Sequence, residues 1–247
     1  MASTPRGTCL VCGVDTTVRC SSCAQAGIDL FFCSPKCQTL AWTGHRLFCG
    51  SCAFPVLFPL LSPDEATSAL QNLDKHNQVY LFEGTVYSAT AAEVAAVRCG
   101  ISKKELKSLI RAGTECTTKR LPLHHRKLQF AIYLARRAHD LFPFKASIRD
   151  DILCSASKKH AELEDDVLPW HLLDANRSQA TLFHALVCLI TITRIGVDQP
   201  IENAVEHAKY LCRYRDAIQA YTAVHFTAEA EGTVRKLMHS EDEPIDL

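Results

Sequence analysis

The chain has 247 residues, of which 47% are hydrophobic, and its basic and acidic residues balance to a net charge of zero at pH 7. This length allows one or two domains, and the hydrophobic content is sufficient for a buried core. The absence of net positive charge argues against a protein that coats nucleic acid. Residues 1–6 contain no apolar segment of the kind found in secretory signals, so we expect an intracellular protein with reduced cysteines.

Eight potential metal ligands fall within the first 49 residues, in four closely spaced pairs. Seven are cysteines and one is a histidine: Cys9, Cys12, Cys20, Cys23, Cys33, Cys37, His45 and Cys49. A structural zinc site takes four N or S ligands in a tetrahedron, and a short-range pair supplies two of them. Eight ligands therefore predict two closed, structural zinc sites, although the spacing alone leaves sequential and interleaved pairings open. A disulfide scaffold is the alternative, but it requires an oxidising compartment.

The spacing C-x2-C-x7-C-x2-C-x9-C-x3-C-x7-H-x3-C, over residues 9–49, resembles the MYND-type zinc finger. The segment Phe32-Cys33-Ser34 and the order of Gln38, Trp42 and His45 add to this resemblance. The resemblance implies a cross-braced pairing, with Cys9, Cys12, Cys33 and Cys37 on one zinc and Cys20, Cys23, His45 and Cys49 on the other. It also implies a shallow groove for Pro-x-Leu-x-Pro-like peptides, whose positions in this chain are Ser21, Gln38 and Trp42.

The residues between the ligands predict a short helix. Ser34 can accept hydrogen bonds from free backbone N–H groups, and Pro35 suits the first helical turn. We expect a helix over residues 35–42 that ends near Gly44, and a further turn that places His45 and Cys49 on one face. A module this small has almost no core of its own. Each zinc is therefore expected to stabilise the finger by about 10–16 kcal/mol.

Residues 50–63 change character, because three prolines interrupt an apolar run and predict an extended linker. Within it, Pro55-Val56-Leu57-Phe58-Pro59 is itself a Pro-x-Leu-x-Pro sequence. Two interpretations stay open: the segment occupies such a groove, with self-association between two chains, or Val56, Leu57 and Phe58 pack onto the following domain. Cys52 lies just outside the ligand pattern, and we expect a free thiol there.

From Ser62 onward the sequence predicts a helical domain over residues 64–238, followed by an acidic tail at 239–247. Ser62-x-x-Glu65, Thr90-x-x-Glu93 and Ser102-x-x-Glu105 suit helix starts, whereas Gly100 and Gly113 suit helix ends. Residues 79–87 have strand composition and predict one short hairpin, and residues 128–141, 178–195 and 201–230 have helical apolar spacing. The expected fold is mainly α: a zinc-stabilised finger followed by an all-α globular domain with that single hairpin. The apolar residues 180–195 are too short, and too polar at His184 and Arg194, for a membrane span.

No catalytic site is indicated by the sequence. Only eight residues precede Cys9, which leaves no room for the first half of a SET methyltransferase domain split around the finger. The His-x-Glu pair considered for iron binding is His239 and Glu241, which lies in the acidic tail and has no histidine after it. The basic residues in 98–137 suit a solvated helix face, with a docking surface for an acidic partner or for nucleic acid as the alternative.

Two functional hypotheses follow. In the first, the chain is a non-catalytic adaptor whose finger binds a proline-containing peptide of a partner protein, because an indole stacks well on proline rings and an amide can bond an extended backbone. In the second, the helical domain is an enzyme or a ligand-binding domain of an unrecognised class, and the finger is a structural brace. With seven thiolates and two zinc ions the finger has no net positive charge, which argues against nucleic acid as its partner.

Overall fold

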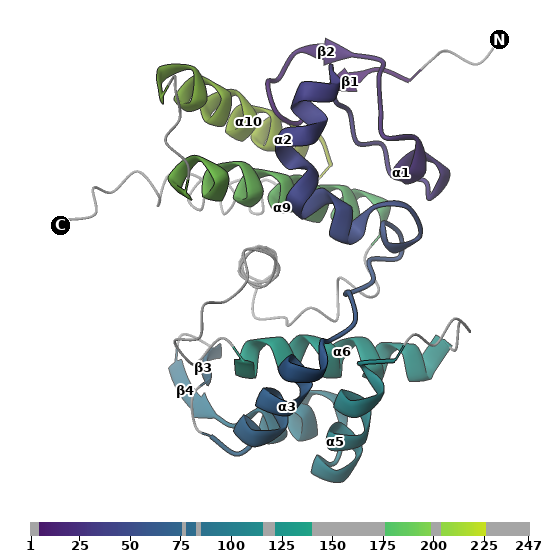
Figure 1. Cartoon of the computed structure of the whole chain (residues 1–247), viewed down its shortest axis with the longest axis vertical. Coiled ribbons are helices and arrows are strands. Elements are labelled where there is room, and N and C mark those ends of the chain that lie inside the picture. The colour runs from purple at the N-terminus through teal and green to yellow at the C-terminus, as the bar shows by residue number, and fades with distance from the viewer. Residues whose placement is uncertain are drawn as a thin grey trace.

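The structure of the protein is a computed structural model that describes residues 5–75, 78–82, 85–115, 122–139, 176–198 and 204–225. The acidic tail and the His239–Glu241 pair lie outside these residues. The described part is mostly helical, as expected, and its helices form two groups (Figure 1). We call the group that contains the finger the zinc lobe and the other group the helical lobe.

The zinc lobe contains the finger and the two last described helices. The finger has two short strands and two helices, followed by two single turns of 3-10 helix: β1 (Gly7–Thr8), β2 (Asp15–Thr16), α1 (Ser21–Gln25), α2 (Pro35–His45), η1 (Arg46–Phe48) and η2 (Gly50–Cys52). The strands β1 and β2 pair antiparallel. The helix α9 (Arg177–Asp198) packs against α2 of this finger, and α10 (Ala204–His225) packs against α9.

The helix α2 begins at the residue expected from the sequence. Ser34 caps α2 as expected, because its hydroxyl accepts a hydrogen bond from the backbone N–H of Cys37 at 3.3 Å. The helix ends at His45, one residue after the expected end near Gly44, and so extends three residues beyond the expected range 35–42. The expected shared helical face of His45 and Cys49 is wrong, because Cys49 has extended backbone angles after η1.

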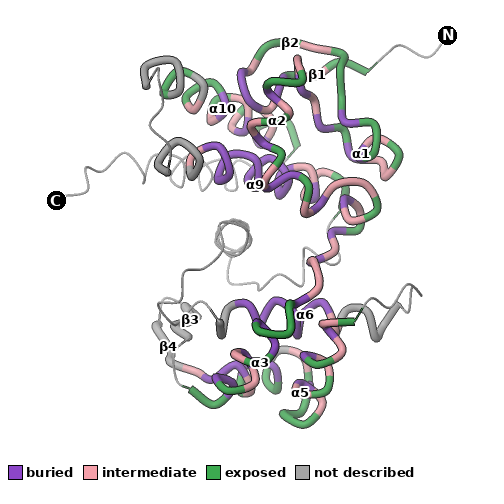
Figure 2. The backbone as a smooth tube through the Cα atoms, in the orientation of Figure 1, coloured by how far each residue is buried: buried purple, intermediate pink, exposed green. Residues whose placement is uncertain are grey.

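The helical lobe consists of a hairpin and four helices. Its elements are α3 (Pro63–Asn72), β3 (Gln78–Phe82), β4 (Thr85–Ala89), α4 (Ala91–Cys99), α5 (Lys103–Ala112) and α6 (Pro122–His139). The strands β3 and β4 pair antiparallel from Gln78 with Ala89 to Phe82 with Thr85, which confirms the expected hairpin. The helix α6 packs against α3, α4 and α5, and its middle is buried (Figure 2).

The boundaries of the helices in this lobe follow the local sequence. Ser62 and Thr90 both form complete capping boxes, with Glu65 and Glu93 three residues later. Gly100 ends α4 with φ of 58°, a left-handed conformation that glycine adopts without steric cost. The ends of these helices are therefore determined by residues within a few positions of them.

The helix α9 is buried along most of its length, and its apolar residues face both α2 and α10. In the middle of α10, Tyr214 is fully buried and donates a hydrogen bond to the carbonyl of Ala185 in α9. No helix in the described part of the chain combines the length and apolarity needed to cross a membrane.

The segment between the lobes is held at several points along its backbone. His184 of α9 bonds the carbonyl of Ala53 at 2.8 Å, and Gln129 of α6 bonds both the N–H and the carbonyl of Phe58. Further along, Arg136 donates to the carbonyl of Leu60 at 2.8 Å. Residues 53–61 therefore form a fixed connection between the lobes.

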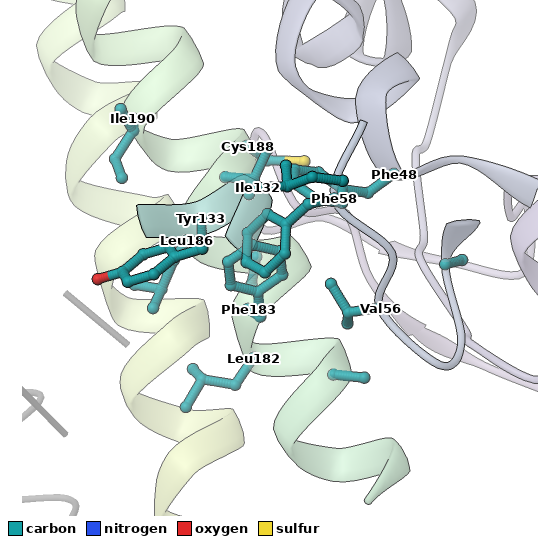
Figure 3. Packing of buried hydrophobic residues seen from close by; sticks show 14 of the residues in the cluster. Phe48, Val56, Phe58, Ile132, Tyr133, Leu182, Phe183, Leu186, Cys188 and Ile190 are labelled. Carbon is teal, nitrogen blue, oxygen red and sulfur yellow. The ribbon is translucent and has the colours of Figure 1, made fainter. Parts of the chain in front are cut away.

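The side chains of this segment fill the space that its backbone crosses. Val56 and Phe58 are buried, and Phe58 lies between Phe48 of the finger and Tyr133 of α6, at ring distances of 6.3 and 5.9 Å (Figure 3). Of the two interpretations of Pro55–Pro59, packing within the chain is the one that this arrangement shows. Self-association through this segment would require Val56 and Phe58 to leave the core.

Candidate metal centre

The eight expected ligands gather into two clusters in the finger. The first contains Cys9, Cys12, Cys33 and Cys37, and the second contains Cys20, Cys23, His45 and Cys49. Within each cluster, all ligand atoms lie within 4.8 Å of one another. The clusters interleave along the chain, so the cross-braced pairing holds and the sequential pairing does not.

The distances within each cluster match the edges of a zinc tetrahedron. A Zn–S bond of about 2.3 Å places two sulfurs about 3.8 Å apart at the tetrahedral angle. In the first cluster, Cys33 Sγ lies 3.3 Å from Cys12 Sγ and 3.6 Å from Cys37 Sγ. In the second, Cys49 Sγ lies 3.6 and 3.8 Å from the sulfurs of Cys20 and Cys23. The two groups therefore fit two structural zinc ions.

The histidine of the second cluster points one defined nitrogen at the sulfurs. His45 Nε2 lies 3.4 Å from Cys20 Sγ and 3.6 Å from Cys23 Sγ. The imidazole is buried, with the ring of Phe32 at 5.6 Å and that of Trp42 at 5.8 Å. These aromatic contacts fix the ring orientation, a task that a hydrogen bond to the other nitrogen performs at many metal sites.

Neighbouring protein groups shift the pKa values of the ligand cysteines in opposite directions. Hydrogen bonds from Cys23 and His45 lower the pKa of Cys20 to about 3, whereas donation to Cys20 and burial raise the pKa of Cys23. In the first cluster, burial raises the pKa of Cys12 to about 11. Zinc must therefore displace protons from these thiols, which makes metal loading dependent on pH.

Four ligands per ion leave no open position at either cluster. A catalytic zinc keeps such a position for water or substrate, whereas a closed site contributes folding energy only. The chemistry available here is therefore structural, and any recognition by the finger must come from its surface.

Comparison with known protein families agrees with this geometry. Residues 9–49 match the family model of the MYND finger. Residues 9–49 are a MYND finger. No curated protein and no solved structure matches the chain. The MYND match thus covers the two metal clusters and does not extend to the helical lobe, α9 or α10.

Of the three expected peptide-contacting residues, Ser21 and Trp42 adjoin ligands of the second zinc site, whereas Gln38 follows Cys37 of the first. Trp42 contacts His45 edge-on, yet 44% of its surface is exposed. Gln38 lies one turn before it on α2 and is half-buried. Ser21 is exposed and directly follows the ligand Cys20. The indole therefore covers part of the zinc site and still offers a free apolar surface.

One residue between two ligands was not recognised from the sequence. Phe48 lies between His45 and Cys49, is fully buried, and contacts Phe183 and His184 of α9 at ring distances of 5.0 and 6.0 Å. Figure 3 shows Phe48, Phe58 and Phe183 in the same core. The second zinc site thus positions the side chain that joins the finger to α9. Its signal in the sequence is a large apolar residue in a module with little core of its own.

Close packing of α2 on α9 explains Gly44. A Cβ atom added there would lie 1.9 Å from Thr191 Oγ1 and 3.1 Å from Val187 Cγ1. The glycine is therefore needed for the approach of the two helices. Gly13 and Gly27 have positive φ and lie against Arg213 of α10 and Arg177 of α9. The MYND finger is thus packed on α9 and α10 at several separate points.

Proposed function

We propose that the MYND finger binds a proline-containing segment of a partner protein, and that the chain acts as a non-catalytic adaptor inside the cell. MYND fingers mediate protein–protein interactions in general, which supports the wider part of this proposal. The finer part, a Pro-x-Leu-x-Pro-like peptide on Ser21, Gln38 and Trp42, rests on the exposed indole beside a closed zinc site.

The single observation that carries the proposal is the exposure of Trp42. Most large apolar side chains of the finger are buried, including Ile28, Leu30, Phe32 and Phe48. An indole that remains 44% exposed offers a flat apolar surface for a proline ring. Gln38, one helical turn away on the same side of α2, adds an amide that can bond the peptide backbone.

The brace function, proposed as an alternative, has its own support. The finger packs on α9 through Gly44 and Phe48, so it stabilises the adjacent helices whatever it binds. Bracing uses the buried side of α2, whereas peptide binding would use the exposed side. The two roles are therefore compatible in one molecule.

The test is a titration of the full chain with a labelled Pro-Ala-Leu-Ala-Pro peptide, using fluorescence anisotropy. We expect saturable binding that Trp42→Ala abolishes and that Trp42→Phe weakens less, because a smaller aromatic ring retains part of the stacking surface. The matched control is Val97→Ala, which removes an exposed apolar side chain from α4 in the helical lobe.

Each variant is also checked for its zinc content, so that loss of binding is not confused with loss of the finger. Equal peptide affinity of the wild-type and Trp42→Ala proteins, with two zinc ions in both, would contradict the proposed surface.

A further inference from the structure

The exposed side of α2 carries a cation next to the indole. Ala41, Gly44 and His45 are buried, whereas Thr39, Trp42 and Arg46 are exposed. Arg46 directly follows α2 and keeps helical backbone angles, with φ of −54° and ψ of −27°. Residues four apart on a helix are neighbours on its surface. Arg46 is therefore the next exposed side chain beyond Trp42 on this side of the finger.

The charge of Arg46 is available for a ligand. Arg46 takes part in none of the ion pairs found among the described residues, whereas Arg19, another exposed arginine of the finger, pairs with Asp29. A cation at this position is attracted to the negative, carboxyl end of the α2 helix dipole. That attraction does not neutralise the guanidinium group, which keeps five N–H donors for a carboxylate.

The second zinc site makes this charge important for an incoming peptide. Three thiolates and one Zn²⁺ leave that site with a formal charge of −1, and Trp42 lies against its histidine ligand. An acidic peptide on the indole would therefore be repelled unless a cation lies nearby. Arg46, four residues after Trp42, offsets this repulsion on the side of α2 where the peptide would lie.

We propose that Arg46 gives the finger a preference for proline-containing segments with an acidic residue close to the proline on Trp42. This inference rests on the proposed function, since it concerns the chemistry of the same partner. Four helical residues rise about 6 Å, and an extended proline-rich peptide rises about 3 Å per residue. For a peptide that lies along α2, the acidic side chain is therefore about two residues from the stacking proline.

The experiment compares three synthetic peptides that share a Pro-Ala-Leu-Ala-Pro core, flanked on both sides by two Glu, two Gln or two Lys residues. Their affinities are measured for the full-length wild-type, Arg46→Gln and Arg46→Glu proteins at low and high salt. The matched control is Lys36→Gln, which removes the same charge from α2 at a position about 120° away from Trp42 around the helix. Zinc content and thermal unfolding verify that each variant retains the finger.

We expect the wild-type protein to bind the Glu-flanked peptide about two- to fivefold more tightly than the Lys-flanked one at low salt, the range that exposed ion pairs produce. High salt should reduce the difference. Arg46→Gln should remove the preference and Arg46→Glu should reverse it, whereas Lys36→Gln should retain it.

The two levels of the proposal fail in different ways. If all three peptides bind through Trp42 with equal affinity, or if Arg46→Gln keeps the preference for Glu, the role of Arg46 is overturned and the peptide site stands. If none of the peptides binds the wild-type protein, the proposed function itself is overturned, and the preference with it.

Discussion

The zinc lobe and the helical lobe achieve the same result, a packed helical core, by different means. In the helical lobe, local caps define the starts of α3, α4 and α5, and these three helices then pack on α6. In the zinc lobe, two metal clusters fix the small finger, and Phe48 and Gly44 attach it to α9. The comparison teaches that a zinc finger at one end of a chain can organise helices that come more than 100 residues later.

This difference changes the expectation for zinc removal. From the sequence, all residues beyond Ser62 are expected to keep their helices without metal, because they have apolar faces of their own. In the structure, α9 shares its core with the finger through Phe183 and His184, and α10 packs in turn on α9, where Tyr214 donates a hydrogen bond to Ala185. Metal loss should therefore affect α9 and α10 and spare the helical lobe.

The largest effect is expected from Cys20→Ala. This change removes a thiolate from the second site, whose zinc is worth about 10–16 kcal/mol of folding energy. We expect the zinc content to fall from two ions per chain to one, together with loss of near-ultraviolet circular dichroism from the aromatic core around Phe48. Cys212→Ala is the control, since Cys212 is an exposed cysteine of α10 outside both clusters. Retention of two zinc ions in Cys20→Ala would contradict the assigned ligand set.

The next effect belongs to the helical lobe. Arg136 and Glu65 form a buried ion pair at 3.4 Å, with only 3% and 8% of their side chains exposed. Arg136→Met leaves Glu65 as a buried charge without its counter-ion and should destabilise the protein by about 3–5 kcal/mol. Urea unfolding measures the loss, and the zinc content should stay at two.

The control for this pair is Lys103→Met, which breaks an exposed ion pair with Asp74 and should cost at most about 1 kcal/mol. Loss of zinc from Arg136→Met would show that the lobes unfold as one unit, against the comparison made above.

A smaller effect is expected where α2 meets α9. Gly44→Ala places a methyl group 1.9 Å from Thr191 Oγ1, and overpacking of this kind costs about 1–3 kcal/mol. Thr191→Ala removes the clashing hydroxyl group, so the double variant should regain part of the lost stability. Thermal unfolding of the four proteins in this cycle provides the measurement. Additive losses in the double variant would mean that the two side chains do not meet.

The smallest effect is a dependence on pH. Burial lowers the pKa of His184 to about 4, although its bond to Ala53 acts in the opposite direction. The unfolded chain binds a proton near pH 6.5, so this histidine contributes stability fully above pH 6.5 and loses it as the pH falls towards 4. At pH 5 the loss is about 2 kcal/mol.

His184→Gln isolates this contribution, because an amide can still donate to Ala53 but does not titrate. The stability difference between pH 7 and pH 5, measured by urea unfolding, should be smaller in the variant than in the wild-type protein. An equal difference in both proteins would assign the pH dependence to other groups, such as the zinc ligands.

Features that depend on short stretches of chain could be predicted from the sequence. The ligand spacing restricted the metal sites to two, and the MYND resemblance selected the pairing that the clusters show. Ser34, Ser62, Thr90 and Gly100 define helix ends through hydrogen bonds within a few residues. The hairpin followed from the strand composition of residues 79–87, and the buried helix α9 followed from helical apolar spacing.

Features that depend on distant contacts could not be predicted. Glycine serves both at helix ends and at close helix contacts, and only the presence of Thr191 distinguishes the second use for Gly44. Likewise, Val56 and Phe58 suit either an exposed peptide or a core, and the bonds from Gln129 and Arg136 decide for the core. Neither the sequence of the finger nor that of α9, taken alone, predicts that the two pack together.

Hydrogen–deuterium exchange, with and without a zinc chelator, tests the central claim most directly. The claim is that the finger, α9 and α10 form one unit that zinc stabilises. We predict that chelation increases amide exchange in residues 9–56, 177–198 and 204–225 and leaves residues 63–72, 103–112 and 122–139 unchanged. Unchanged exchange in α9 and α10, with increased exchange confined to residues 9–49, would contradict this account.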